Sequence, residues 1–187
     1  MRLLSGVIAV ASLVAVALMP FAVSAQSQQP YAGYQTRPIK ALSQEQIADL
    51  KAGRGMGLAL AAELNGYPGP SHVLELAQAL GLSDAQRTKV QELFAAMKAE
   101  TVPLGEKLIA QEADLEHRFA GKTITAATLS AAMQAIATTQ AALRTAHLKY
   151  HLATVEVLAP VQIQRYAELR GYSSGLQPKH LHGGHQQ

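Results

Sequence analysis

The sequence predicts an all-helical fold built on a long antiparallel helical hairpin, with short helices before and after it. Apolar side chains recur every three or four residues over two long segments, as in helices that bury one face. Only the short turn Gly121-Lys122-Thr123 separates these segments, so the two helices must lie antiparallel. No stretch alternates apolar and polar residues between turn residues, so no sheet is expected.

The composition restricts the class of protein. The chain has 187 residues, with 16 Lys and Arg against 13 Asp and Glu, and 49% of its residues are hydrophobic. This length permits one domain, and the apolar content is too high for a disordered chain. A net charge of +3 with interleaved acids and bases disfavours nucleic-acid binding. The chain has no Cys, which excludes disulfides, thiolate ligands and a cysteine nucleophile.

The first 25 residues are typical of a secretory signal peptide. Arg2 precedes an apolar run over residues 3–23, and the small residues of Val23-Ser24-Ala25 end it. We expect cleavage after Ala25 and export to a periplasm. The alternative is an uncleaved membrane anchor, because the run approaches the length that a bilayer needs. Residues 26–41 show no helical or strand period and are predicted to be a flexible leader.

The helical domain is expected over residues 42–171. Ser43 and Gln46 have the spacing of a capping box for a first helix, which the glycines between 53 and 57 should weaken or bend. This helix should stop in the Gly- and Pro-rich residues 65–70. A short helix is expected over residues 71–80, ended by Gly81.

The first long helix is predicted over residues 84–119, with Ser83 and Gln86 as its capping box. Pro103 should kink this helix without ending it, because the apolar stripe keeps its phase across the proline. The stripe consists of Val90, Phe94, Met97, Thr101, Leu104, Leu108, Gln111 and Leu115.

The second long helix is predicted from a cap at Thr125 to Leu158, and a final helix over residues 160–171. The stripe of the second long helix consists of Leu129, Met133, Ile136, Gln140, Leu143, His147, Tyr150 and Thr154. Two narrow stripes cannot shield so long a hairpin, so the N-terminal helices, a second copy or a client must cover it. We expect a dimer. The tail over residues 172–187 is rich in Gly, Ser and His and is predicted to be disordered.

Two short motifs frame the hairpin, Leu82-Ser83-Asp84-Ala85-Gln86 and Leu158-Ala159-Pro160-Val161-Gln162. Their placement resembles that of the LTxxQ motifs in the Spy/CpxP family, and the resemblance covers residues 82–170, about half of the chain. The residues that match these motifs are Leu82, Ser83, Gln86, Leu158 and Gln162. Ser83 replaces the threonine of the motif conservatively, whereas Ala159 lacks the capping hydroxyl.

The resemblance implies a small envelope-stress protein of the periplasm that forms a dimeric cradle. Family members act as ATP-independent chaperones or as regulators that sense damage through a membrane partner. Related proteins of the CnrX and ZraP kind bind transition metals. The family's cradle is typically rich in basic residues, whereas the first long helix here mixes three Lys with five Glu residues. This departure argues against a strongly cationic client surface.

The first functional hypothesis is therefore a Spy/CpxP-like chaperone that binds unfolded or misfolded periplasmic proteins without ATP. Adjacent polar and apolar groups would hold such clients with modest affinity. The residues expected to form the client surface and the seam of the hairpin are Val90, Phe94, Met97, Leu104 and Leu108.

The second hypothesis is a periplasmic sensor or scavenger of Zn, Ni or Cu. His147 and His151 lie four residues apart, so both imidazoles project from one face of the second long helix. The alternative is that they are interhelical or partly exposed histidines without a metal. A third ligand could come from the N-terminal helices if these fold across the hairpin, the candidates being His72, Met56 and Glu63.

The tail offers a second set of imidazoles, His180, His182 and His185, which could capture such metals loosely or form an incidental polar tail. Catalysis has no evident basis in the sequence. No serine has a nucleophile-elbow context, no His-Glu-x-x-His occurs, and the acids are expected at solvent-facing positions without a buried pair. We therefore expect no enzyme and no required cofactor. A weaker possibility is an inert structural partner of a membrane receptor.

Overall fold

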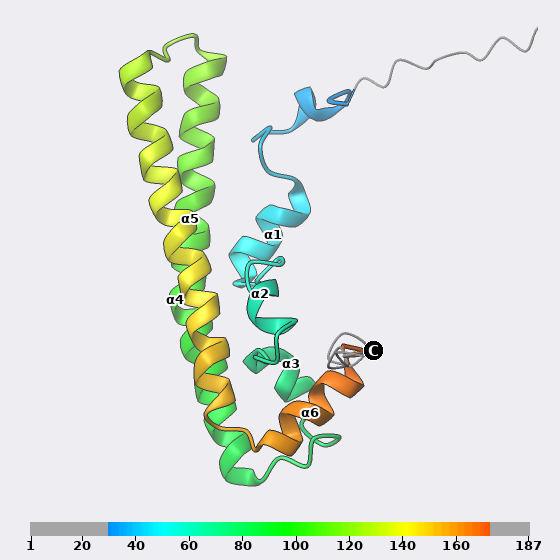
Figure 1. The fold of residues 1–187 in the computed structure, drawn as a ribbon. Coiled ribbons are helices and arrows are strands. Elements are labelled where there is room, and N and C mark those ends of the chain that lie inside the picture. Colours follow the sequence, from blue (N-terminus) through cyan, green and yellow to red (C-terminus); the bar gives the residue numbers. More distant parts are fainter. Residues whose placement is uncertain (1–29, 173–187) are drawn as a thin grey trace, which may run out of the picture. The chain divides into compact units, whose positions relative to one another are not determined.

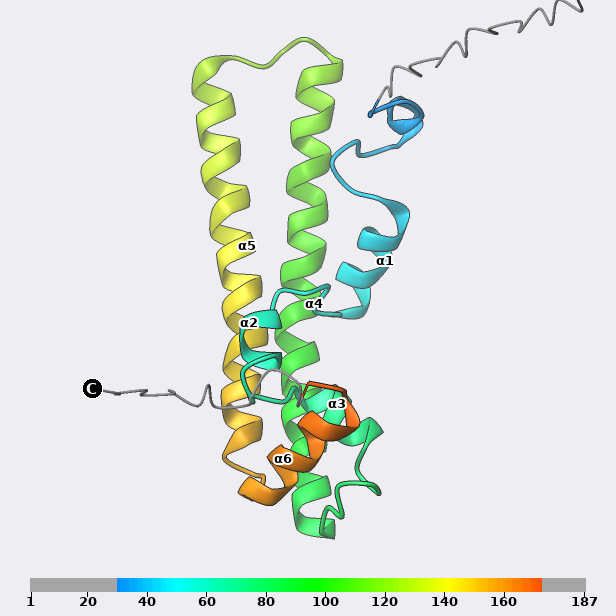
Figure 2. The same ribbon diagram turned by 45° about the vertical axis from the view of Figure 1, so that its right-hand side comes forward.

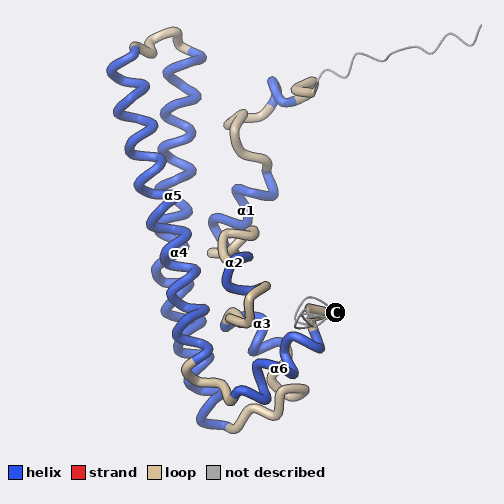
Figure 3. Tube along the Cα trace, viewed as in Figure 1, coloured by secondary structure: helices blue, strands red, loops and turns tan. Residues whose placement is uncertain are grey.

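The computed structural model describes residues 30–172, and of these the residues from Gly33 to Tyr172 belong to one compact unit. Every regular element between residues 30 and 172 is helical, which confirms the predicted fold class (Figure 3). The predicted signal peptide and the tail histidines lie outside the described residues. None of the helices in the described part of the chain is long and apolar enough to cross a membrane.

The helical hairpin is formed by α4 (Asp84–Ala120) and α5 (Ala126–Val155), which run side by side in opposite directions (Figure 1; Figure 2). Both begin with a capping box, made by Ser83 and Gln86 in α4 and by Thr125 and Thr128 in α5. Pro103 lies inside α4, and the helix continues through it as predicted. In contrast, α5 ends three residues before Leu158, where the chain turns.

The segments before the hairpin are shorter than predicted. The expected first helix is divided into α1 (Gln44–Ala52) and α2 (Leu60–Glu63), because the chain turns between them at the predicted glycines. Helix α3 (Pro70–Glu75) is followed by turns, although a helix was expected to continue to residue 80. A 3₁₀ turn, η1 (Tyr34–Thr36), precedes these helices, and α6 (Pro160–Leu169) follows the hairpin.

The chain's own N-terminal segments cover one side of the hairpin. Helices α1 and α3 pack against α4, and α2 and α3 contact α5. A Cβ atom at Gly105 would overlap the backbone carbonyl of Leu50, so the bare glycine permits the close approach of α1 to α4. The end of the predicted leader also contacts α4, because Lys40 Nζ lies 2.6 Å from Glu116 Oε1.

Two apolar clusters hold these layers together. We call the first the base cluster; its buried members are Val73, Ala77, Leu80, Leu82, Val90, Leu158 and Tyr166. The second, the middle cluster, has the buried members Leu50, Leu108, Ile136 and Leu143. The far end of the hairpin, next to the turn at residues 121–125, carries exposed apolar side chains instead: Phe119, Leu129 and Met133.

The two glutamine motifs meet at the base of the hairpin. Gln86 Nε2 donates to Gln162 Oε1 over 2.8 Å, and Gln162 Nε2 donates to Gln86 Oε1 over 3.1 Å. Each amide oxygen also accepts from the backbone N–H at the start of its own helix, from Ser83 over 3.1 Å and from Ala159 over 2.9 Å. The reciprocal pair therefore joins the starts of α4 and α6, although Ala159 supplies no side-chain cap.

Candidate functional site

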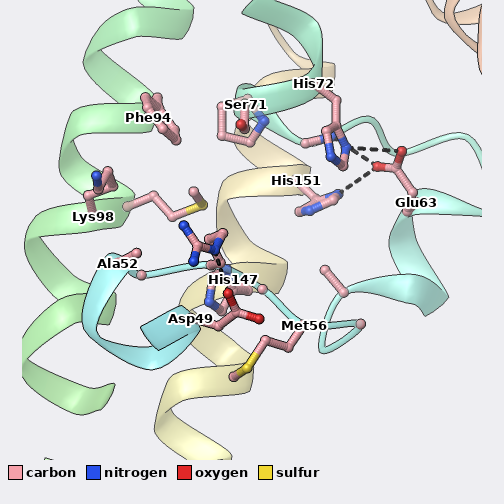
Figure 4. A pocket seen from close by; sticks show the side chains of 18 of the residues that line it. Asp49, Ala52, Met56, Glu63, Ser71, His72, Phe94, Lys98, His147 and His151 are labelled. Atoms are coloured by element: carbon pink, nitrogen blue, oxygen red, sulfur yellow. Dashed lines mark hydrogen bonds and ion pairs between the residues drawn. The ribbon is translucent and has the colours of Figure 1, made fainter. Parts of the chain in front are cut away.

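A cavity of about 580 Å³ lies between the N-terminal segments and both hairpin helices (Figure 4). This volume is within the range of small-ligand sites. The polar and sulfur-containing side chains among its lining residues are Asp49, Arg54, Met56, Glu63, Ser71, His72, Glu75, Met97, Lys98, His147 and His151. A third metal ligand from the N-terminal helices was expected only if these helices fold across the hairpin. In the structure they do.

Glu63 is the centre of the polar cluster in this cavity. It ends α2 and is only 6% exposed. Its Oε1 lies 3.4 Å from His72 Nδ1, and its Oε2 lies 3.8 Å from His151 Nδ1. Figure 4 shows the two imidazoles directed toward the carboxylate. The expectation that the acidic residues are solvent-facing is wrong for Glu63, because the loop that follows α2 folds it inward against the hairpin.

Helix α6 and the residues after it contribute further contacts to Glu63. The Tyr166 hydroxyl donates a short hydrogen bond to Glu63 Oε1, and the Tyr172 hydroxyl lies 3.3 Å from the same oxygen. Arg170 Nε is 3.8 Å from Oε1, and the Gly69 N–H donates to Oε2 over 3.3 Å. Sequence reasoning missed the three α6-side groups, because residues that are more than one hundred positions apart make these contacts.

The surroundings of Glu63 favour its charged form. Burial alone would raise the pKa of the carboxyl, but hydrogen bonds from His72 and Tyr166, with the charges of the two imidazoles, lower this pKa from 4.5 to about 2. Burial, followed by the hydrogen bond to Glu63, raises the pKa of the Tyr166 hydroxyl. Glu63 is therefore a carboxylate and Tyr166 a neutral donor at neutral pH.

His151 has a defined orientation in the cavity. Its Nδ1 lies 2.6 Å from the backbone carbonyl oxygen of Tyr67. A carbonyl can only accept, so Nδ1 carries the proton and Nε2 of the neutral ring keeps a lone pair. A Cβ atom at Gly69 would come within 2.7 Å of Nε2, so the bare glycine permits this loop to pack closely against the ring.

His147 lies one helical turn from His151 and is 2% exposed. Its Nε2 is buried and has no hydrogen-bond partner. Burial, and next the charge of His151, lower the pKa of His147, so the ring is neutral at neutral pH. Within residues 30–172, no three His, Asp or Glu side chains are arranged so that together they could hold a metal ion as they stand. Any metal site built from Glu63, His72, His147 and His151 therefore requires side-chain movement.

The residues expected to bind clients are largely covered. Val90 is 0% exposed in the base cluster, Met97 is buried against the cavity, and Leu108 is buried in the middle cluster. Phe94 and Leu104 are partly buried. The N-terminal segments occupy the surface that was expected to be free, so in this structure the three buried residues belong to the packed seam and are not open to a client.

The motif residues lie around the starts of α4 and α6: Leu82 and Leu158 are in the base cluster, and Ser83, Gln86 and Gln162 are at the helix starts. Comparison of the chain with protein-family models, with curated proteins and with solved structures finds no match.

One sequence feature could have indicated the site. Glu63 is the single charged residue in the otherwise apolar stretch 56–64, and such a residue needs polar partners if its segment is buried.

Proposed function

We propose that the protein is an exported periplasmic protein that binds a divalent transition metal in the cavity between its N-terminal segments and its hairpin. Glu63, His72 and His151 are the principal ligands, and His147 is a further donor. The observation that carries the proposal is the convergence of one buried carboxylate and two imidazoles from three separate segments. The Glu63 oxygens lie 3.4 Å from His72 Nδ1 and 3.8 Å from His151 Nδ1.

The chemistry of these donors fits Zn²⁺, Ni²⁺ or Cu²⁺. Imidazole nitrogens and carboxylate oxygens are common ligands of such ions in sites without thiolates. The contact of His151 Nδ1 with the Tyr67 carbonyl is the arrangement that usually orients a metal-ligating histidine, because it leaves Nε2 free for the ion. His147 Nε2 in the same cavity has no hydrogen-bond partner, so it can act as a further ligand in the tautomer that protonates Nδ1.

The resemblance to the Spy/CpxP family, and to its CnrX and ZraP relatives, supports the same assignment and the periplasmic location. The predicted signal peptide is consistent with export. On this proposal the protein senses or captures the metal without ATP and acts as a homodimer or with a membrane sensor protein.

Titration calorimetry with Zn²⁺ tests the proposal. The chain without its signal sequence carries His180→Asn, His182→Asn and His185→Asn, so that the tail cannot contribute. We expect one saturable site, weakened at least about tenfold by Glu63→Gln or His72→Asn. The control is His117→Asn, an exposed histidine near the end of α4, which should bind Zn²⁺ as tightly as the parent. Equal affinity in the Glu63 and His117 variants, or no binding, contradicts the proposal.

A chaperone is the second candidate, and one observation favours it. Phe119, Leu129 and Met133 are 53%, 37% and 46% exposed at the far end of the hairpin, where none of the segments described from residue 30 onward covers them. Apolar side chains gathered on two adjacent helices could hold partly unfolded proteins. The purified chain should then suppress aggregation of a denatured client without nucleotide. Leu129→Ser with Met133→Ser should abolish this activity, whereas Leu152→Ser, an exposed residue elsewhere on α5, should not.

A further inference from the structure

The end of α6 is attached to the N-terminal segments by the same carboxylate that the proposed metal site uses. We infer that coordination of a divalent cation by Glu63, His72 and His151 displaces the hydroxyls of Tyr166 and Tyr172 from Glu63 and loosens the C-terminal end of α6. Release of this end is then the structural change that distinguishes the metal-bound protein. This inference rests on the proposed function.

The first step is a count of lone pairs. A carboxylate offers about four lone-pair sites. Oε1 of Glu63 faces Tyr166, Tyr172 and His72, and Oε2 accepts from the Gly69 N–H. A cation needs at least one of these lone pairs. Oε2 keeps a free lone pair, but Oε1 is the oxygen that faces the proposed ligand His72, and three donors crowd around its two lone pairs. A tyrosine hydroxyl must therefore leave Oε1 when this oxygen becomes the ligand.

The second step is that His72 changes its role in the same exchange. His72 Nδ1 now faces Glu63 Oε1 at 3.4 Å, and its side chain is 39% exposed. To bind the ion, the His72 ring must point a nitrogen lone pair toward it. His72 can then no longer donate a hydrogen bond to Glu63 Oε1. The half-exposed position of His72 at the edge of the cavity leaves room for this rotation. The buried His151, in contrast, is held by Tyr67 and keeps its orientation.

The third step concerns what else holds α6. The start of the helix is fixed independently of Glu63, because Gln162 pairs with Gln86 and Ile163 packs against the base cluster. The end of the helix depends on Glu63 for its polar contacts to the N-terminal segments, through Arg170 Nε at 3.8 Å and Tyr172 Oη at 3.3 Å. Tyr166 is also buried in the base cluster, and Tyr172 packs against it. Loss of the polar contacts therefore loosens residues 166–172 without detaching them, while the start of α6 remains in place.

Thermodynamic linkage gives the quantitative test. If the cation and the tyrosine hydroxyls compete for one carboxylate, removal of a hydroxyl must strengthen cation binding. A hydrogen bond to a charged group is among the stronger ones, so Tyr166→Phe should raise the affinity for Zn²⁺ about tenfold. A purely structural role for Tyr166 predicts unchanged or weaker binding.

The experiment compares Zn²⁺ affinity in the chain with the three tail histidines replaced. Tyr166→Phe is measured against Tyr150→Phe, whose hydroxyl contacts Glu100 on α4 and not Glu63. We expect tighter binding only in the first variant. Tyr172→Phe should also raise the affinity for Zn²⁺, and it replaces Tyr166→Phe in the test if that variant does not fold. In parallel, hydrogen exchange of residues 166–172 should accelerate on addition of Zn²⁺, and that of residues 140–146 in α5 should not.

The outcomes separate the two proposals. Suppose that the parent chain binds Zn²⁺ through Glu63, but neither tyrosine variant binds Zn²⁺ more tightly and hydrogen exchange at residues 166–172 is unchanged. The inference that Zn²⁺ loosens the end of α6 is then wrong, whereas the proposed metal site is retained. If the parent chain does not bind Zn²⁺, the proposed function fails, and the inference fails with it.

Discussion

The base and the far end of the hairpin differ in what lies against them. Both belong to the same two helices, and the helical spacing of apolar residues runs through both. At the base, α3, the turns after it and α6 bury the apolar side chains, and α2, α3, α5 and α6 supply the polar cluster around Glu63 (Figure 1). At the far end, Phe119, Leu129 and Met133 stay exposed. The comparison teaches that an apolar stripe on a helix indicates a face that can be covered, and that other segments decide how much of it is covered.

The largest expected effect comes from truncating leucines of α5 in the two regions. Leu143 is 3% exposed in the middle cluster, whereas Leu129 is 37% exposed. Leu143→Ala should lower the free energy of unfolding by about 2–5 kcal/mol, because it leaves a cavity. Leu129→Ala should lower it by less than about 1 kcal/mol. Urea denaturation followed by circular dichroism measures both. Equal losses would mean that a second copy or another surface covers the far end.

The next effect is the acid sensitivity of the base. The pKa of Glu63 is lowered from 4.5 to about 2 in the folded chain, so the folded state favours the carboxylate. The resulting stabilisation, on the order of 3 kcal/mol, is complete above pH 4.5 and is lost as the pH falls toward 2. Denaturation of the metal-free protein between these pH values should show this loss. Glu63→Gln should be less stable at pH 6 and should lose less stability over the same pH interval; parallel profiles would contradict the assignment.

A smaller effect is expected from two glutamines in similar capping boxes. Gln46 closes only the box of α1, whereas Gln86 also donates to Gln162 and to the Val157 carbonyl, over 2.8 and 2.9 Å. Gln86→Glu removes these donors and places a carboxylate against an amide oxygen, at a cost of about 1–3 kcal/mol.

The matched variant Gln46→Glu keeps a good capping box and should change stability by less than about 0.5 kcal/mol. Denaturation of both variants at pH 7 makes the comparison. Equal effects would show that the reciprocal glutamine pair contributes nothing beyond helix capping.

The smallest effect concerns the link between the leader and α4. The hydrogen bond from Lys40 Nζ lowers the pKa of the Glu116 carboxyl. Lys40→Ala should therefore raise this pKa toward 4.5, as measured by NMR titration. Lys51→Ala, which removes an exposed lysine of α1, should leave the pKa of Glu116 unchanged. An unshifted Glu116 in the Lys40 variant would mean that residues near 40 do not dock on α4 in solution.

Local patterns predicted the helices well, because their determinants lie close together in sequence. Ser83 with Gln86 and Ser43 with Gln46 form the expected capping boxes, and the chain reverses direction after Gly121. The third ligand candidate Glu63 could be named, since carboxylates suit metals, but its burial could not. The hydrophobic period of one segment contains no information about which segment packs on it.

The candidate site was only partly predictable for the same reason. The spacing of His147 and His151 placed them on one helix face, and both are indeed buried. The contacts of Tyr166, Arg170 and Tyr172 with Glu63 join residues more than one hundred positions apart. The burial of Val90, expected on a client surface, likewise follows from α3 and α6 folding onto α4 and α5.

The close approach at Gly105 gives the N-terminal segments a single docking position along α4. The Leu50 carbonyl fits against this residue because it has no side chain. A shift of α1 by one turn of α4 would bring the carbonyl against Thr101 or Ile109, whose Cβ atoms would block it. Gly105 therefore fixes the position of α1 along α4, so the N-terminal segments that line the cavity cannot slide along the hairpin.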